Sequence, residues 1–348
     1  MVAMAPALGA VLLQEIDAVN EDLQRSTEAG ACEVPVVDLQ GVDGERRHLV
    51  VQQIRRACED WGVFQVINHG VPVALLTAML QQAKEFFQLP VEEKRKLSTT
   101  WVNQTTPQPV LLQGYSSKEY GKCFLQWGEQ LRHIISPVWE RNYELWPTNL
   151  PSYRETEEDY IAEQEKFVKH MMELISESLG LNKSAITDVF DGNYQRALLA
   201  NHYPPSPDPS VSVGITEHSD FSIITVILQD TLGLQAQTRD GGWRCVRPIR
   251  DALVVNLGDQ LQILTNRKYQ SGVHRATVDS ENKRVSVNTF TNPLDDALVT
   301  PIPALLGESQ PPLYQGHTYG AYKAAFGARW EKKRAFLKSG SPKNPASF

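Results

Sequence analysis

The sequence predicts a mainly β protein with α-helices, in which a helical and mixed N-terminal half packs on an all-β C-terminal core. Before residue 193, apolar side chains recur chiefly at helical spacing, with two short β-rich runs between the helices. After residue 193, short runs rich in β-branched residues follow at close intervals, separated by the turn signals PPSPDPS, RDGG and LGDQ. Several short strands at regular spacing are typical of a sandwich or a barrel.

The composition is that of a globular protein that buries a sizeable core. The 348 residues are 41% hydrophobic and 22% charged, and the formal net charge is −7. No stretch concentrates Lys and Arg, so a nucleic-acid groove, which needs a basic face, is not expected. No apolar run approaches the length that spans a bilayer, so a membrane partner is not expected either.

The four cysteines predict neither a zinc ribbon nor a disulfide framework. Cys32, Cys58, Cys123 and Cys245 stand far apart, and none forms a CxxC pair. Before Arg25 there is no basic residue that could begin a targeting peptide, and the chain ends without a retention signal. We therefore expect reduced thiols and a cytoplasmic location.

The N-terminal part alternates helices and strands. In the second expected helix, Leu49, Val50, Ile54 and Ala57 fall on one face, and Gly62 ends the helix. The elements expected in order are a helix over 7–23, a strand over 34–39, a helix over 44–60, a strand over 63–68 and a helix over 74–87.

A charged segment and a loop precede the longest helix. Pro90 begins a short helix, EEKRK, which we expect to be solvated because charges dominate it. The stretch 99–109 has no periodicity and is expected to be a loop, whereas apolar residues at helical spacing predict a helix over 152–179, ended by Gly180.

The expected strands of the C-terminal core are ALLANHY, SIITVILQ, LGLQAQT, WRCVRP, ALVVNLG and RVSVNTFTN, and the tail after Gly316 is basic and helical. We divide the chain into an N-terminal helical and mixed region (1–110), a connecting helical segment (111–192), a β core that carries the candidate site (193–310) and a helical tail (311–348). These parts are expected to form one catalytic unit.

A candidate metal site lies in the β core. His218 and Asp220 are two residues apart just before an expected strand, and residues at this spacing in an extended chain point to the same side. His274 lies near the end of another expected strand. Two histidines and one carboxylate form the facial triad of non-haem Fe(II) oxygenases, which leaves metal positions open for a bidentate oxoacid and O2.

A second pair at the same spacing suggests the oxoacid. Arg284 and Ser286 would place a guanidinium and a hydroxyl on one face of a strand, as a clamp for the distal carboxylate of a dicarboxylate requires. The alternative for Arg284 is a surface ion pair. Asn201 and Tyr203 repeat the spacing in another expected strand.

Several longer segments carry a family resemblance: ACEDWGVFQVINHGVP (57–72), EFFQLPVEEK (85–94), NHYPPSPDP (201–209), EHSDFSIITVILQD (217–230), VVNLGDQLQILTNRKYQSGVHRA (254–276) and RVS (284–286). In these segments the chain resembles the plant 2-oxoglutarate- and Fe(II)-dependent dioxygenases of the flavonoid and hormone type, and is similar to anthocyanidin synthase and flavanone 3-hydroxylase. The resemblance covers nearly the whole chain.

The resemblance implies a double-stranded β-helix, or jelly-roll, core flanked by helices. It implies Fe(II) at His218, Asp220 and His274, with ascorbate as reductant. It also implies which residues bind the co-substrate 2-oxoglutarate. Arg284 and Ser286 would bind its distal carboxylate, Tyr203 would add a further hydrogen bond, and Asn201 would lie beside the metal. His69 and His202 are expected to be structural.

The substrate is predicted to be a small plant metabolite, flavonoid or phenylpropanoid-like, that is hydroxylated or desaturated with succinate and CO2 as co-products. Phe290 stands where similar enzymes stack aromatic substrates, although no acidic residue follows it before Leu294. Further apolar candidates for the pocket are Tyr115, Phe124, Trp127 and Leu131, each of which could instead be core packing.

Other functions stay open at this point. The runner-up substrate is a plant hormone such as a gibberellin, auxin, jasmonate or salicylate. There are three alternatives of other classes: an oxidase of the same fold that does not use 2-oxoglutarate, a non-catalytic jelly-roll protein that binds small molecules, and a zinc hydrolase. The zinc hydrolase is disfavoured because no HExxH motif is present. We expect a monomer that binds O2 and a small molecule.

Overall fold

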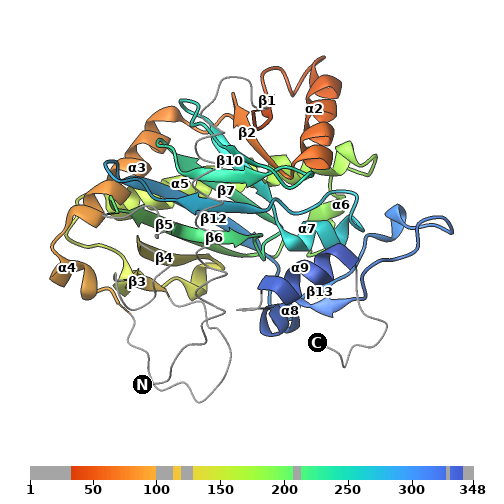
Figure 1. The fold of residues 1–348 in the computed structure, drawn as a ribbon. Helices are drawn as coiled ribbons and strands as arrows, with labels where there is room; N and C mark the ends of the chain where they lie inside the picture. The colour runs from red at the N-terminus through yellow and green to blue at the C-terminus, as the bar shows by residue number, and fades with distance from the viewer. Residues whose placement is uncertain (1–32, 99–112, 119–127, 207–212, 327–329, 340–348) are drawn as a thin grey trace.

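The computed structural model describes residues 33–98, 113–118, 128–206, 213–326 and 330–339 (Figure 1). The helix expected over 7–23 and the loop expected over 99–109 lie outside these residues, as do Phe124 and Trp127.

An eight-stranded sheet forms the centre of the molecule (Figure 1). Its strands are antiparallel except for the first pair. In spatial order they are β1 (Val36–Asp38), β2 (Val63–Ile67), β10 (Leu253–Leu257), β7 (Ile224–Gln229), β12 (Arg284–Asn292), β5 (Gln195–Tyr203), β4 (Gly128–Ser136) and β3 (Gly114–Lys118).

A smaller antiparallel sheet completes the jelly roll that was predicted. Its four strands are, in spatial order, β6 (Val213–His218), β11 (His274–Thr277), β8 (Leu234–Gln237) and β9 (Trp243–Cys245). A two-stranded ribbon of β13 (Leu298–Val299) and β14 (His317–Thr318) follows the core. The architecture is mainly β with flanking helices.

The long helices cover one face of the large sheet. They are α2 (Arg47–Asp60), α3 (Val73–Gln88) and α5 (Tyr153–Ser178); α3 packs on β5, β7 and β12, and α5 packs on α2 and α3 (Figure 1). Within the described part of the chain, no helix is both long and apolar enough to cross a membrane.

Strand alternation separates the two faces of the large sheet. On β5 and β12, Leu198, Ala200, Val285 and Val287 point toward the helices and belong to the main hydrophobic core. Each fully buried side chain of this kind stabilises the fold by about 1.5–3 kcal/mol. Successive side chains of a strand point to opposite faces, so the alternate residues of these strands face the smaller sheet and are free to build a site.

The remaining helices are short or lie at the C-terminal end. α8 (Tyr319–Phe326) and α9 (Trp330–Ser339) pack on each other, and α9 packs on α7 (Asp259–Leu264). Both helices lie in the segment for which a helical tail was predicted. The short elements are α4 (Val91–Arg95), α6 (Ala185–Asp188), η1 (Val138–Glu140), η2 (Tyr143–Leu145) and η3 (Pro303–Leu305).

The segment 111–192, expected to be helical, also contributes β3 and β4 to the large sheet. In β4, Leu131 and Ile135 face the core together with His133, which is fully buried and pairs with Glu157 of α5 at 2.8 Å. A polar side chain at a position that faces the core hides the alternation that would have predicted this strand.

Two smaller predictions were wrong. Leu49 is 45% exposed, so the buried face of α2 is made by Val50, Ile54 and Ala57 without it. Lys94 of α4 is buried and lies 2.5 Å from Glu129 of β4, so the charged segment is not solvated throughout. In both cases the tertiary neighbours, which are distant in sequence, decide the burial.

Candidate metal centre and cavity

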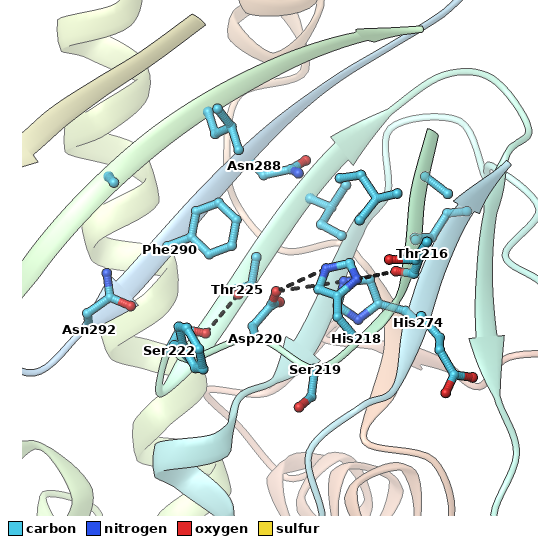
Figure 2. A pocket seen from close by; sticks show the side chains of 18 of the residues that line it. Thr216, His218, Ser219, Asp220, Ser222, Thr225, His274, Asn288, Phe290 and Asn292 are labelled. Atoms are coloured by element: carbon cyan, nitrogen blue, oxygen red, sulfur yellow. Dashed lines mark hydrogen bonds and ion pairs between the residues drawn. The ribbon is translucent and has the colours of Figure 1, made fainter. Parts of the chain in front are cut away.

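Three predicted metal ligands meet at the end of the smaller sheet. His218 ends β6, His274 begins β11, and the two residues are paired across the ladder. One potential ligand atom from each of His218, Asp220 and His274 lies within 4.8 Å of the others. Figure 2 shows the Asp220 carboxylate pointing toward both imidazoles, with each Nε2 at 3.7 Å from Oδ1.

The local strand placement differs from the prediction. His218 and Asp220 precede β7, as predicted, but the strand β6 that ends at His218 was not predicted. His274 was expected near the end of a strand and begins β11, and Asp220 lies in the segment between β6 and β7. Because Asp220 lies outside both strands, strand alternation alone does not determine the direction of its side chain. The backbone of its segment is held instead by α7, because the Asp259 N–H donates to the Asp220 carbonyl at 2.8 Å.

Close packing of two glycines fixes the chain just before His274. A Cβ on Gly272 would meet the Val63 side chain at 2.4 Å and the Gly62 carbonyl at 2.6 Å. Gly62 has φ of +76° and would itself meet the Gln270 carbonyl at 2.4 Å. Only glycine permits this approach of backbone to backbone, which brings β11 against the start of β2.

The imidazole rings are oriented by backbone carbonyls. Nδ1 of His218 lies 2.8 Å from the Thr216 carbonyl, and Nδ1 of His274 lies 3.0 Å from the Gly272 carbonyl. Each Nδ1–H donates to its carbonyl, which leaves the Nε2 lone pair for a metal. Burial, followed by the neighbouring His274, lowers the pKa of His218, and the neutral form is the one that ligates.

The donor set fits a divalent transition metal. Asp220 Oδ2 is buried without a hydrogen-bond partner in the described part of the chain. A buried carboxylate oxygen that lacks a donor is costly unless a cation binds it. Two imidazole nitrogens and one carboxylate oxygen at one site are the ligands of non-haem Fe(II).

The expected carboxylate clamp is buried and lacks an acidic partner. Arg284 is 5% exposed; its Nη2 donates to Gln229 Oε1 at 2.8 Å and its Nη1 lies 3.4 Å from Ser286 Oγ. Among the described residues no carboxylate pairs with Arg284, and its Nε has no acceptor. The surface ion pair considered as an alternative is therefore wrong. A buried guanidinium without a counter-charge is a site for an anion.

The neighbouring strand brings the other two co-substrate candidates to the same place. Tyr203 is paired with Arg284, and Asn201 with Ser286, in the register of β5 and β12. Both amide atoms of Asn201 are buried without a partner among the described residues. The Arg284 guanidinium lies 5.5 Å from the centre of the Tyr203 ring.

The metal ligands, Arg284 and Tyr203 line one cavity of about 570 Å³, whereas Ser286 and Asn201 are not among its lining residues. This volume is in the range of small-molecule sites, which spans roughly 300–1,000 Å³. Asn288, Phe290 and Asn292 project from β12 into the same space as the triad (Figure 2). Phe290 therefore lines the cavity, and its role as a substrate contact stays a prediction.

The other aromatic candidate for substrate contact lies elsewhere. Tyr115 is 4% exposed, packs edge-on against Phe86 at 6.0 Å between ring centres and donates to Glu129. Leu131 is fully buried in the same hydrophobic core. Neither residue lines the cavity, because the faces of β3 and β4 that carry them point toward the helices.

The two histidines expected to be structural have partners outside the cavity. His202 stacks on Phe87 at 5.1 Å, and its Nδ1 lies 2.8 Å from Glu129. His69 Nε2 lies 2.8 Å from the Asp251 carbonyl.

Four residues around the site were missed from the sequence. Gln229 holds Arg284, and Asn256 Nδ2 lies 3.4 Å from the His274 ring nitrogens. Lys333 of α9 is buried, donates to the Ser219 carbonyl at 2.6 Å and pairs with Asp259 at 3.0 Å. Arg132 of β4 lines the cavity. The available signal was a polar residue inside an apolar strand, as in ITVILQ and LVVNL.

Comparisons with known proteins show which family the chain resembles. Residues 194–293 match the family model described as 2OG-Fe(II) oxygenase superfamily, and residues 34–149 match the model described as non-haem dioxygenase in morphine synthesis N-terminal. The chain is 38% identical over 314 residues to Protein DOWNY MILDEW RESISTANCE 6 of Arabidopsis thaliana, covering 88% of this chain and 89% of that one.

Two further relatives carry names that describe chemistry. The chain is 36% identical over 280 residues to Naringenin,2-oxoglutarate 3-dioxygenase of Callistephus chinensis, covering 79% of this chain and 76% of that one. The crystal structure of JOX2 in complex with 2OG, Fe, and JA superposes with a TM-score of 0.76 at 32% identity, covering 93% of this chain and 91% of that one.

Proposed function

Because the chain belongs to the 2OG-Fe(II) oxygenase superfamily, we propose that His218, Asp220 and His274 hold its Fe(II). The observation that carries the proposal is the convergence of their ligand atoms within 4.8 Å on the wall of a cavity that is also lined by Arg284, which pairs with no carboxylate among the described residues. When bound there, Fe(II) supplies the activation of O2, coupled to conversion of 2-oxoglutarate to succinate and CO2.

Arg284 and Ser286 bind the distal carboxylate of 2-oxoglutarate in this proposal. The guanidinium offers the fork of donors that a carboxylate accepts, and Gln229 keeps it in place. Tyr203 closes one side of this subsite, and Asn201 offers its unpartnered amide beside it. The clamp orients the co-substrate so that its oxoacid end faces the triad.

The lining residues of β12 hold the organic substrate in this proposal. Phe290 offers a ring face for stacking, and Asn288 and Asn292 offer amide groups on either side of it along β12. Holding one C–H bond toward the metal and keeping water out determine which position is oxidised. One atom of O2 enters the substrate as a hydroxyl and the other enters succinate. If the substrate loses a second hydrogen instead, the product is desaturated and the first oxygen atom leaves as water with the two hydrogens.

The substrate that this site suits best is an aromatic plant metabolite of the flavonoid or phenylpropanoid type. Phe290 in the cavity supports it, and so does the likeness to an enzyme named for naringenin. A plant hormone is the second candidate, supported by the likeness to a structure that contains JA.

An anaerobic titration followed by product analysis tests the proposal. Fe(II) and 2-oxoglutarate are added without O2, and the visible charge-transfer band of the chelate is followed while metabolites are added. O2 is then admitted, and succinate and oxidised products are measured by mass spectrometry. Turnover without succinate would favour the oxidase that does not use 2-oxoglutarate. Iron binding without turnover of any metabolite would favour a binding protein.

We also propose that the enzyme acts as a cytoplasmic monomer. Cys58 is a buried free thiol, as is usual in a reducing compartment. Light scattering of the purified protein and imaging of a fluorescent fusion would test the two statements separately.

A further inference from the structure

Arg132 places a positive charge in the cavity, on a different part of the large sheet from Arg284 and Ser286. It lies on β4 opposite Leu199 of β5, and Leu199 is paired with Asn288 of β12, which is paired with Ile227 of β7. All four residues of this row line the cavity. The next row toward the clamp contains Asn201 and Ser286, so Arg132 belongs to the substrate part of the cavity.

The Arg132 side chain has no partner within the described part of the chain. Its Nε is buried without an acceptor, and no carboxylate forms an ion pair with the guanidinium. Burial lowers the pKa of Arg132 without discharging it, and among the described residues the titratable group that acts on it is the neutral phenol of Tyr319. Arg132 is half-buried, so its guanidinium faces the cavity rather than bulk water, where a positive charge favours binding of an anion.

The other cations that line the cavity already have assigned partners. Lys323 pairs with Asp295 at 2.5 Å, and Lys333 pairs with Asp259 at 3.0 Å. Arg284 is the proposed ligand of 2-oxoglutarate. Among the described lining residues, Arg132 is therefore the remaining cation for a negative group of the organic substrate.

We propose that Arg132 binds a carboxylate of the organic substrate, and that the substrate is an aromatic acid. The planar fork of a guanidinium matches a carboxylate with two parallel hydrogen bonds. Phe290 lies one row further along the same face of the sheet, where it can stack on the ring of an acid anchored at Arg132. This inference rests on the proposed function and narrows its substrate class.

Binding of matched acids and esters tests the inference. Cinnamate, benzoate and their methyl esters, with naringenin as a neutral aromatic, are titrated by anaerobic calorimetry into enzyme loaded with Fe(II) and 2-oxoglutarate. We expect the acids to bind about 10- to 100-fold more tightly than their esters, as suits a buried charge-assisted pair. Arg132→Gln should remove this preference without weakening the esters, and Arg132→Lys should retain part of it.

Lys323→Gln is the matched control, because it removes a cation of the same cavity that already has an acidic partner. It should keep the preference for acids. Equal binding of acids and esters by the wild-type protein would overturn the inference. An unchanged preference for acids in Arg132→Gln would also overturn it.

The 2-oxoglutarate affinity separates this inference from the proposed function. If Arg132→Gln weakened 2-oxoglutarate rather than the acids, Arg132 would belong to the co-substrate site and the inference would be wrong. If none of the acids bound to enzyme that still binds 2-oxoglutarate, the inference would fail while the proposed function stood. If 2-oxoglutarate itself did not bind, both would fail.

Discussion

Asp220 is the residue on which the metal site depends most. Its carboxylate is the one negative group facing both imidazoles, and its Oδ2 has no other partner among the described residues. We expect Asp220→Ala to lower iron content and 2-oxoglutarate-dependent succinate formation by at least about 100-fold, more than the usual loss of a group that only supports a ligand. Plasma mass spectrometry of the reconstituted protein measures the iron.

Asp296→Ala is the control for that variant, since Asp296 is exposed and lies outside the cavity. It should bind iron as the wild-type protein does. Full iron occupancy in Asp220→Ala would remove Asp220 from the metal site.

Arg284 determines the use of 2-oxoglutarate. Because a hydrogen bond to a charged group is worth about 1.5–3 kcal/mol, Arg284→Ala should raise the KM for 2-oxoglutarate by roughly 10- to 100-fold. Arg284→Lys should recover part of the loss, since a lysine keeps the charge and loses the fork. Steady-state succinate assays at varied 2-oxoglutarate provide the measurement.

The control is Arg250→Ala, whose side chain is 92% exposed and lies outside the cavity. An unchanged KM in Arg284→Ala, with normal folding, would assign the co-substrate to another cation.

At the residue scale, the sequence predicts which side chains lie together when they are close along the chain. Arg284 and Ser286 are neighbours on one face because they are two apart in a strand. Arg132 could not be predicted in this way. It enters the cavity only because β4 pairs with β5, and that pairing joins residues nearly seventy positions apart.

At the scale of elements, the loop between β7 and β8 supports the clamp. Gly233 lies in this loop with φ of +131°, and a Cβ there would meet Arg284 Cδ at 2.7 Å and the Thr277 carbonyl at 3.1 Å. Gly233→Ala should therefore displace the guanidinium and raise the KM for 2-oxoglutarate, by less than Arg284→Ala because an arginine side chain can partly adjust. Succinate assays at varied 2-oxoglutarate measure it.

Gly241→Ala is the control that separates the effect of the contact with Arg284 from the effect of backbone strain. Gly241 also has a positive φ, +94°, but a Cβ there would have no atom within 4 Å. Both variants lose some stability because alanine rarely adopts a positive φ. If the two variants had the same KM, the contact with Arg284 would play no part.

Elements with a clear apolar period were the ones that could be predicted. The helix α5 and the strands β7, β10 and β12 lie where the sequence placed them. β3, β4, β6 and β11 were missed or displaced, because charged or functional side chains occupy positions at which an ordinary strand carries apolar ones. Such elements are stabilised by their neighbours rather than by their own sequence pattern.

At the scale of the whole molecule, distant segments complete one sheet. The N-terminal strands β1 and β2 join the core through β10, and β3 and β4 join it through β5. Composition and periodicity predicted a β core but not these pairings, since strand order depends on contacts between remote residues. The family resemblance supplied the jelly roll, and the structure shows that the N-terminal segments extend its larger sheet.

Glu129 links several of these segments, and it makes the stability of the whole fold sensitive to acid. Its carboxylate accepts from Lys94 of α4, Tyr115 of β3 and His202 of β5. Burial alone would raise the pKa of Glu129, but the hydrogen bonds from His202, Lys94 and Tyr115 outweigh burial and lower the pKa to about 2. The ordinary value is 4.5.

A depressed pKa in the folded state stabilises the fold fully above the pKa of the unfolded chain. The contribution of Glu129 should therefore be present above about pH 4.5 and should be lost as the pH falls toward 2. Glu129→Gln should lower the free energy of unfolding by on the order of 1–3 kcal/mol at neutral pH and by much less near pH 2. Urea unfolding at a series of pH values measures both.

A comparison with an exposed ion pair tests whether the three hydrogen bonds to Glu129 contribute to the free energy of unfolding. Glu163 pairs with Lys166, whose side chain is 71% exposed, so Glu163→Gln should change the unfolding free energy by less than about 1 kcal/mol at every pH. If Glu129→Gln behaved in the same way, the bonds of Glu129 would not hold the N-terminal segments to the core. If its effect were large but independent of pH, lost packing rather than lost charge would explain it, because only the ionised carboxylate can accept from all three donors at once.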